Sequence, residues 1–157
     1  MRRDRSRAKN TADFAEGMEG LLMSVLAISR SLRALASDAG LTPTELAILV
    51  RLDQHSEQRA ADVAAAAALH RTLVSRVLAG MEDKGLISRA ADQADRRASR
   101  LTITRAGHEL LADIRARQAE WLADRIGRLP TDDVSRLLAA VPALAALAEA
   151  NEAASGQ

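Results

Sequence analysis

The sequence predicts an all-α protein with one small β-hairpin, and three observations lead to this prediction. Alanine and leucine are abundant, tyrosine is absent, and Phe14 and Trp121 are the only aromatic residues. With so few aromatic residues, the core is expected to be aliphatic and the strands few. Apolar residues recur at helical spacing along most of the chain, and only the segment 86–104 alternates apolar and polar residues as strands do.

Length and composition narrow the class further. A chain of 157 residues suits one compact domain, or a small module fused to an oligomerisation module. The absence of cysteine excludes disulfides and thiolate metal sites. Four arginines lie close behind Met1, but no apolar stretch long enough for a signal peptide or a membrane span follows them. We therefore expect a soluble, cytoplasmic protein without a membrane partner.

A long first helix is expected over residues 11–38, after a basic tail that should fray over residues 1–10. Its apolar residues step by four, three, four and three, a helical periodicity with heptad character: Leu21, Val25, Ile28, Leu32 and Leu35. Gly40 ends this helix. Thr42, Pro43 and Glu45 then form a capping-box pattern that predicts a second helix over residues 43–54.

Two further helices joined by a short turn follow, over residues 59–67 and 69–84. A turn this short predicts two helices that meet at an angle, which is the geometry of a helix-turn-helix. The second of these helices has an apolar face made of Val74, Val77, Leu78 and Met81. Its opposite face is small, polar and cationic, and it consists of Arg71, Thr72, Ser75, Arg76 and Ala79.

A β-hairpin is predicted directly after the helix-turn-helix. Gly85 supplies the left-handed position that ends the helix, and residues 86–89 form the first strand. The tip runs over residues 91–99, after which Leu101 and Ile103 alternate with threonines as in a half-buried strand. Thr104 closes the strand as the N-cap of the next helix. A hairpin attached in this way to a helix-turn-helix is a wing.

Two helices complete the chain. The fifth should run from Thr104 to about residue 128, because Pro130 ends it. Thr131 is expected to cap a sixth helix that has acidic residues in its first turn, where the helix dipole favours anions. Pro142 lies inside this helix and should kink or break it near Val141.

The terminal helices carry more apolar surface than a small winged domain can cover. We therefore expect an N-terminal tail and dimerisation helix (residues 1–40), a winged helix-turn-helix region (41–104) and C-terminal dimerisation helices (105–157), integrated in one homodimeric domain. The alternative is a bundle of three helices within one chain.

The segment from Asp95 to Gly107 fits the pattern D-x-R-x-x-x-L-x-[LI]-T-x-x-G at every position. This pattern resembles the hallmark of the multiple-antibiotic-resistance regulator (MarR) family of winged helix-turn-helix transcriptional regulators. The resemblance implies a ligand-responsive repressor that binds a pseudo-palindromic operator in double-stranded DNA as a homodimer. The alternative is a winged-helix protein-interaction module without sequence-specific DNA binding.

The resemblance also implies a small-molecule effector, which in such regulators is often a phenolic or other amphipathic anion. Its pocket would be built from the first, second and fifth helices. Trp121 is the only large ring on the fifth helix, so it is the one candidate contact for an aromatic effector. Because aromatic residues are so scarce, a regulator with no ligand or with another trigger stays open.

The distribution of charge favours a nucleic-acid partner, although the formal net charge is only +1. Residues 70–105 carry eight Arg and Lys against four Asp and Glu, a balance of +4, whereas residues 106–157 carry five against eight, a balance of −3. Local charge sets the field that a phosphate backbone meets. Only Lys9 and Lys84 among the 22 cationic residues are lysines, and guanidinium suits contacts to phosphate and guanine. A GC-rich codon bias would explain the same excess of arginine.

Candidate contacts to base edges in the major groove lie at the start of the helix 69–84, and they are His70, Arg71, Thr72, Ser75 and Arg76. His70 stands where the family more often has a small N-cap residue, so it is either a phosphate contact or an incidental substitution. The alternative for the whole set is an ordinary solvated helix face.

Candidate contacts in the minor groove lie at the tip of the hairpin, where Arg96 and Arg97 stand. In the proteins that this chain resembles, an arginine at the tip enters the adjacent minor groove, and the family pattern favours Arg97. Asp95 would repel phosphate, so we expect it to cap the loop or to orient the guanidinium of Arg97 or of Arg76. Two further arginines flank the hairpin and either contact phosphate or belong to a solvated charge run: Arg89 and Arg100.

The sequence predicts no metal site, no cofactor and no catalytic centre. Three histidines are scattered, without the paired spacing or the acidic neighbours of a metal site: His55, His70 and His108. No Ser-His-Asp order, phosphate-cradling glycine loop or carboxylate pair points to catalysis. We therefore do not expect an enzyme.

Overall fold

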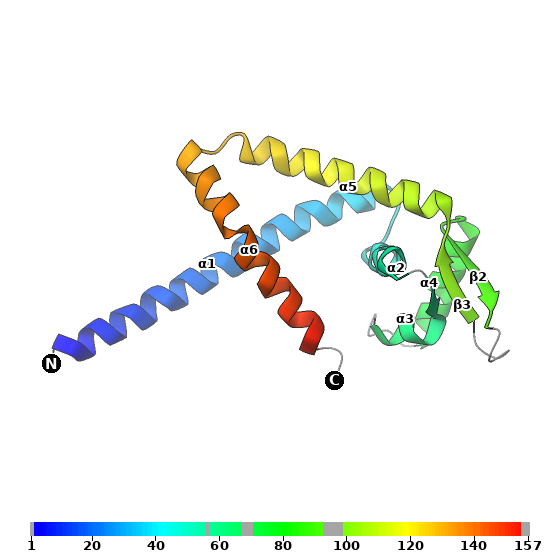
Figure 1. Cartoon of the computed structure of the whole chain (residues 1–157), viewed down its shortest axis with the longest axis horizontal. Helices are drawn as coiled ribbons and strands as arrows, with labels where there is room; N and C mark the ends of the chain where they lie inside the picture. Colours follow the sequence, from blue (N-terminus) through cyan, green and yellow to red (C-terminus); the bar gives the residue numbers. More distant parts are fainter. Residues whose placement is uncertain (1, 56, 67–70, 93–98, 155–157) are drawn as a thin grey trace. The chain divides into compact units, whose positions relative to one another are not determined.

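The computed structural model describes residues 2–55, 57–66, 71–92 and 99–154. The chain divides into two compact units, Met1–Ala116 and Arg117–Gln157. Its elements follow in the order α1 (Arg2–Asp38), α2 (Pro43–Gln54), β1 (Gln58–Arg59), α3 (Ala60–Ala66), α4 (Arg71–Asp83), β2 (Ile87–Ala91), β3 (Ser99–Ile103), α5 (Arg105–Ile126) and α6 (Thr131–Ala154) (Figure 1). The predicted class, all-α with a small β-hairpin, is confirmed.

Local chemistry sets the ends of several helices. The amide of Glu45 donates to Thr42 Oγ1 (3.2 Å), and the amide of Thr42 donates to Glu45 Oε2 (2.7 Å), so the predicted capping box starts α2. Gly40 and Gly85 have φ angles of +81° and +69°, in the left-handed region that glycine adopts without strain. These glycines follow α1 and α4, as the sequence predicts.

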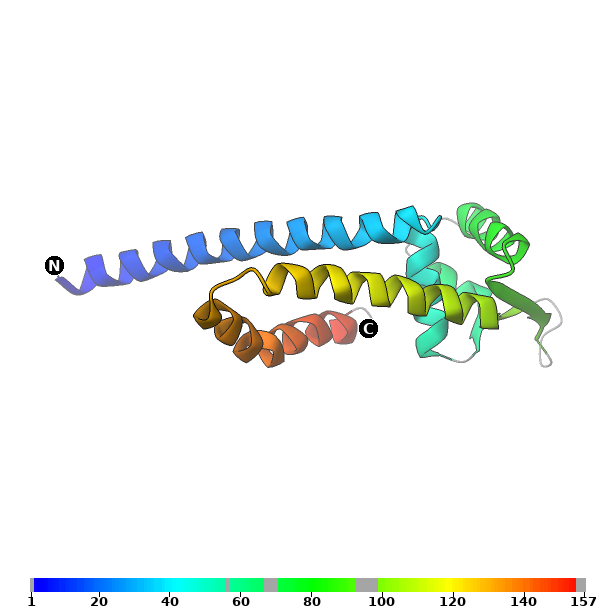
Figure 2. The same ribbon diagram turned by 90° about the horizontal axis from the view of Figure 1, so that it is seen from above.

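The antiparallel sheet has three strands in the order β1-β3-β2. The hairpin of β2 and β3 pairs Ile87 with Ile103 and Ala91 with Ser99, and its first strand ends two residues later than predicted. A further strand, β1, was not predicted, and it pairs with β3 at Leu101. Because Arg59 belongs to β1, α3 begins at Ala60 and not at residue 59. Within the first unit, the hairpin lies far from the N-terminal end of α1 (Figure 2).

The core of the first unit is aliphatic, as predicted from composition. It joins α2, α3, α4, the sheet and the first half of α5, and the end of α1 contributes Ala36. Its main buried side chains are Leu41, Ile48, Leu49, Leu52, Val63, Val74, Leu78, Met81, Leu86, Ile87, Leu101 and Ile114. This core fixes α4 against the rest of the winged region.

Thr104 joins the start of α5 to the turn between α4 and β2. Its Oγ1 accepts from the amide of Gly107 (3.1 Å), which is the predicted N-cap, and it also donates to the carbonyl of Gly85 (2.7 Å). The amide of Thr104 donates to the carbonyl of Leu86 (3.1 Å). A Cβ atom on Gly107 would overlap that same Leu86 carbonyl oxygen and would lie 2.7 Å from Cγ1 of Ile103. The threonine and the glycine of the motif therefore hold α5 against the turn that follows α4.

Two predictions about the terminal helices are wrong. Helix α1 begins at Arg2, so the expected tail is helical; arginine, lysine and alanine are strong helix formers and extend the helix toward its N-terminus. Helix α6 begins at Thr131, and the carbonyl of Pro130 accepts from the amide of Val134 (3.1 Å), so Pro130 and not Thr131 is the N-cap.

The sequence predicts a kink or a break near Pro142. The structure shows no break, because α6 continues through this residue. Proline removes the amide that would have donated to the carbonyl of Leu138. The helix continues through Pro142 without this one backbone hydrogen bond.

The stretch Phe14–Asp38 of α1 is long and apolar enough, by length and composition, to cross a membrane. The expectation that the chain has no such stretch is therefore wrong. The stretch is this apolar because Arg30 and Arg33 are the only charged residues between Glu19 and Asp38. A helix that packs its apolar face against another protein helix can have the same length and composition.

Candidate nucleic-acid interface

Helix α4 has two chemically different faces, as predicted. Val74, Leu78 and Met81 are at most 2% exposed and pack in the core, with Val77 partly buried beside them. The opposite face is exposed and consists of Thr72, Leu73, Ser75, Arg76 and Ala79. The helix is thus anchored on one side and presents small, polar and cationic groups together with one apolar side chain, Leu73, on the other.

Arg76 is the cation placed best for contact with a partner on this face. Its side chain is exposed, and no residue in the described part of the chain forms an ion pair with it. Thr72 precedes Arg76 by one helical turn, so the two side chains share a face. A guanidinium that is exposed and held on a packed helix can pair with guanine or with phosphate.

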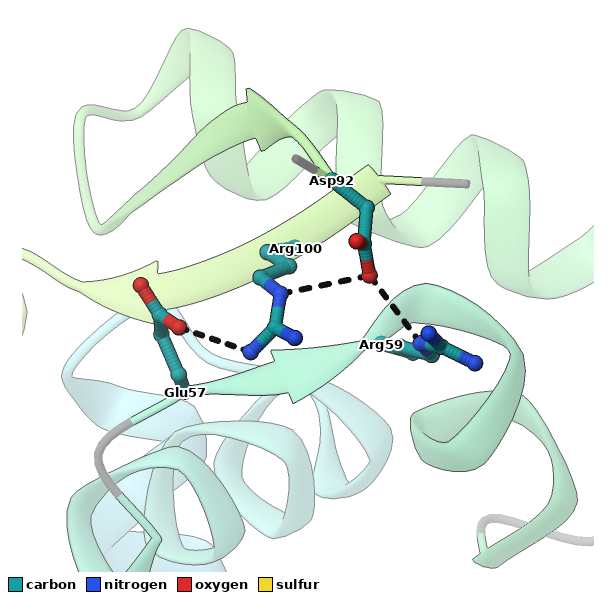
Figure 3. Close-up of polar contacts among 4 residues, drawn as sticks. All are labelled: Glu57, Arg59, Asp92 and Arg100. Carbon is teal, nitrogen blue, oxygen red and sulfur yellow. Dashed lines mark hydrogen bonds and ion pairs between the residues drawn. The ribbon is translucent and has the colours of Figure 1, made fainter. Parts of the chain in front are cut away.

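The tip end of the paired strands is held by a buried carboxylate that the sequence did not reveal. Asp92 follows β2 and is 1% exposed. Its Oδ2 accepts from Nε of Arg59 (3.0 Å) and from Nε of Arg100 (3.2 Å), and Nη1 of Arg100 donates to Oε2 of Glu57 (2.8 Å) (Figure 3). Two guanidinium groups offset the cost of burying this carboxylate. The four side chains connect the segment around β1 to both strands of the hairpin.

This network changes the interpretation of the arginines that flank the hairpin. The hydrogen bond to Glu57 and the charge of Asp92 raise the pKa of Arg100, so its guanidinium stays charged and bound within the sheet. Nε of Arg89 lies 3.1 Å from Oε2 of Glu82 on α4. Both arginines therefore hold parts of the winged region together, a role that neither of the two predicted alternatives included.

Four of the predicted DNA contacts and wing residues lie outside the described residues: His70, Asp95, Arg96 and Arg97. Arg71 is the first residue of α4, but its side chain also lies outside the described part. Thr72, Ser75 and Arg76 are placed together on the exposed face of α4. The assignment of all these residues to DNA, and of Asp95 to wing orientation, stays a prediction.

A second ionic network supports α4 from its C-terminal end. Nζ of Lys84 donates to Oε1 of Glu45 (2.7 Å) and to the carbonyl of Gly40 (3.2 Å). Burial alone would raise the pKa of Glu45, but the hydrogen bonds from Lys84 and Thr42 outweigh it and hold that pKa below its ordinary value. The capping box of α2 is therefore joined to the turn after α4.

Helices α2 and α5 are joined by one carboxylate. Asp53 accepts from Nη1 of Arg115 (2.8 Å) and forms a hydrogen bond with Nδ1 of His108 (2.9 Å). The hydrogen bond from Arg115 lowers the pKa of Asp53 and outweighs the opposing effect of burial, and His108 adds to the lowering. His108 is thus part of an ion-pair cluster, and the sequence alone gave no sign of this.

Trp121, the candidate effector contact, is half-buried in the second unit. The guanidinium of Arg125 lies 3.7 Å from the centroid of its ring, so one face of the indole is engaged in a cation–π contact.

The sequence predicts no metal site. Among the described residues, no group of three or more His, Asp or Glu is arranged to hold a metal ion.

Comparison with known proteins agrees with this geometry. Residues 41–99 match the model of the MarR family. An HTH-type transcriptional regulator of Mycobacterium tuberculosis is 26% identical over 129 residues, which cover 82% of this chain and 90% of the relative. The predicted resemblance to the MarR family is therefore confirmed over the winged region.

Two solved structures share the fold. A point mutant of MepR from S. aureus, bound to an oligodeoxyribonucleotide, matches with a TM-score of 0.66 and 20% identity, over 79% of this chain and 91% of that one. NadR in complex with 4-hydroxyphenylacetate matches with a TM-score of 0.58 and 23% identity, over 80% of this chain and 89% of that one.

Proposed function

We propose that this chain, a transcriptional regulator of the MarR type, is a repressor that binds a pseudo-palindromic operator as a homodimer. The observation that carries the proposal is the exposed cationic face of α4, which lies on a helix anchored in the core beside a hairpin fixed by Asp92. A rigid helix with one exposed polar face is the element that enters the major groove in winged helix-turn-helix proteins. A protein with this role acts where the chromosome is, in the cytoplasm.

Within this proposal the two parts of the winged region have different tasks. Arg71, Thr72, Ser75 and Arg76 contact base edges or phosphates in the major groove, with His70 beside them. Arg97, with Arg96, enters the adjacent minor groove, and Asp95 orients the wing. The network of Asp92 supports this division because it holds the ends of β2 and β3 between which the tip of the hairpin lies.

The homodimer is supported by apolar surface on the two terminal helices. On α1 the exposed large apolar side chains are Phe14, Met18, Leu21, Leu22, Met23, Val25, Leu26 and Ile28. On α6 they are Leu137, Leu138, Val141, Leu144 and Leu147. Apolar surface of this extent marks a protein interface, and a second copy of the chain is the partner that supplies two recognition helices for two half-sites.

A small-molecule effector completes the proposal. The fold is shared with NadR, whose structure contains 4-hydroxyphenylacetate. In this chain Trp121 supplies the single large ring, and the guanidinium of Arg125 over one of its faces adds a positive charge that suits an aromatic anion. We therefore expect an effector of this chemistry to weaken binding to the operator.

Binding to DNA is tested by a salt titration with the full chain and a duplex from its own promoter. The logarithm of the binding constant should fall linearly with the logarithm of salt concentration, by about 0.9 for each phosphate neutralised. Sedimentation should give a dimer, and Val25→Asp should give monomers with much weaker binding. Affinity that does not depend on salt contradicts the proposal and favours a winged-helix module that binds another protein.

A further inference from the structure

Leu73 is an apolar side chain in an unusual place. It is 49% exposed on α4, next to Thr72 and one turn before Arg76. It belongs neither to the buried core nor to the partly buried side chains packed against that core, whereas Val77, one turn further on, does. Leu73 is therefore not part of the core cluster of the described region.

Its position is also unlike that of the other exposed apolar residues. Among the described residues, the other large apolar side chains with this degree of exposure lie on α1, on the second half of α5, on α6 or in the turn before α6. The proposed function assigns those on α1 and α6 to the dimer interface. Between residues 39 and 116 of the described chain, Leu73 alone is large, apolar and exposed, and it lies on the surface proposed to meet DNA.

In the major groove the apolar feature of the base edges is the C5-methyl group of thymine. We infer that Leu73 contacts this methyl group and thereby recognises a thymine. The inference rests on the proposed function, and it requires that each half-site of the operator contain a thymine at the position that Leu73 contacts. Side chains three residues apart on a helix lie about 5–6 Å apart at Cβ, and bases along one strand are about 3.4 Å apart. The thymine should therefore lie within one or two base pairs of the base that Arg76 contacts.

The experiment compares thymine with deoxyuridine, which lacks the methyl group and keeps every hydrogen-bonding group. The wild-type full chain first selects its duplexes from a randomised pool. Each thymine of a selected duplex is then replaced by deoxyuridine, one at a time, and the dissociation constant is measured. In each half-site one replacement should raise the dissociation constant about threefold to fivefold, the factor expected when one buried methyl group is lost from an interface.

Two variants of Leu73 and one control variant assign the effect to this residue. With Leu73→Ala the same replacement should change the affinity by less than about 1.5-fold, because the contact is already lost. The control Asp83→Asn alters an exposed residue at the other end of the same helix and should keep the full penalty for deoxyuridine. Leu73→Met, which keeps an apolar side chain of similar volume, should keep most of it. Thermal unfolding of each variant verifies that the exposed substitution leaves the fold intact.

The outcomes separate the inference from the function on which it rests. Salt-dependent binding in which no deoxyuridine weakens the wild type overturns the role of Leu73 and leaves the regulator intact. An equal penalty in the wild type and in Leu73→Ala does the same. If the chain selects no duplex and binds none in a salt-dependent way, the proposed function fails, and the inference fails with it.

Discussion

The carboxylate of Asp92 lies 3.0 Å from Nε of Arg59, and this ion pair joins the residue that follows β2 to the residue that precedes α3. The side chain of Asp92 is fully buried, whereas that of Arg59 is 48% exposed. Arg100 binds the same carboxylate oxygen. The position of the hairpin relative to the helix-turn-helix therefore depends in part on one charged group.

Replacement of Asp92 by asparagine tests this dependence. Asp92→Asn keeps the size of the side chain but removes the charge between two guanidinium groups. The free energy of unfolding, measured with urea, should fall by about 1–3 kcal/mol, a range that allows for the solvent exposure of both arginines. The control Asp83→Asn removes an exposed carboxylate at the end of α4 and should change stability by less than about 0.5 kcal/mol. Equal effects would show that the buried network contributes nothing specific.

Two glycine substitutions should have opposite effects on stability. Gly107→Ala places a methyl group against the carbonyl of Leu86, so we expect a loss of about 2 kcal/mol or more in the free energy of unfolding. Gly80→Ala lies inside α4 with no atom within 4 Å of the new methyl group. It should raise stability by about 0.5–1 kcal/mol, since alanine favours the helix. If Gly107→Ala is neutral, the close approach of α5 to the Leu86 carbonyl is wrong.

Glu45 should make the protein sensitive to acid. Its pKa is lower in the folded chain than in the unfolded chain, because Lys84 and Thr42 bind the charged form. The stabilisation is therefore present above the unfolded pKa and is lost as the pH falls through the folded pKa. Glu45→Gln should be less stable than the wild type at pH 7, and its stability should fall less between pH 5 and pH 3 in urea titrations. The control Glu109→Gln removes an exposed carboxylate from α5 and should keep the wild-type loss in acid.

Arg76 should determine operator sequence if it contacts a base. Arg76→Ala is then expected to weaken binding by about 1–3 kcal/mol and to relax the preference at one base pair of each half-site. Binding constants for a set of single-base operator variants measure both effects. Arg136→Ala, which removes an exposed arginine from α6, should leave the preferences unchanged. An equal loss on every operator variant would instead make Arg76 a phosphate contact.

Local sequence patterns predicted the parts of the fold that local chemistry determines. The capping box of Thr42 and Glu45, the left-handed Gly85, the N-cap of Thr104 and the two faces of α4 each depend on residues a few positions apart. Such features can be recognised without knowledge of the rest of the chain.

The parts that were missed depend on distant residues. Strand β1 has only two residues, both polar, and it is a strand because it pairs with β3 more than 40 residues later. Asp92 looks like an ordinary polar loop residue, and its burial follows from arginines on two other strands. The family pattern includes Asp95 but not Asp92. Neither a propensity nor a periodicity contains the information that Asp92 would be enclosed.

The contact at Gly107 has a mechanical consequence. No side-chain atom separates the first turn of α5 from the carbonyl of Leu86, and Thr104 bonds to both residues of the turn that follows α4. Two backbones in direct contact cannot slide past each other without breaking these hydrogen bonds. A displacement of the start of α5 should therefore displace the C-terminal end of α4 with it, so that these two helix ends move as one rigid unit.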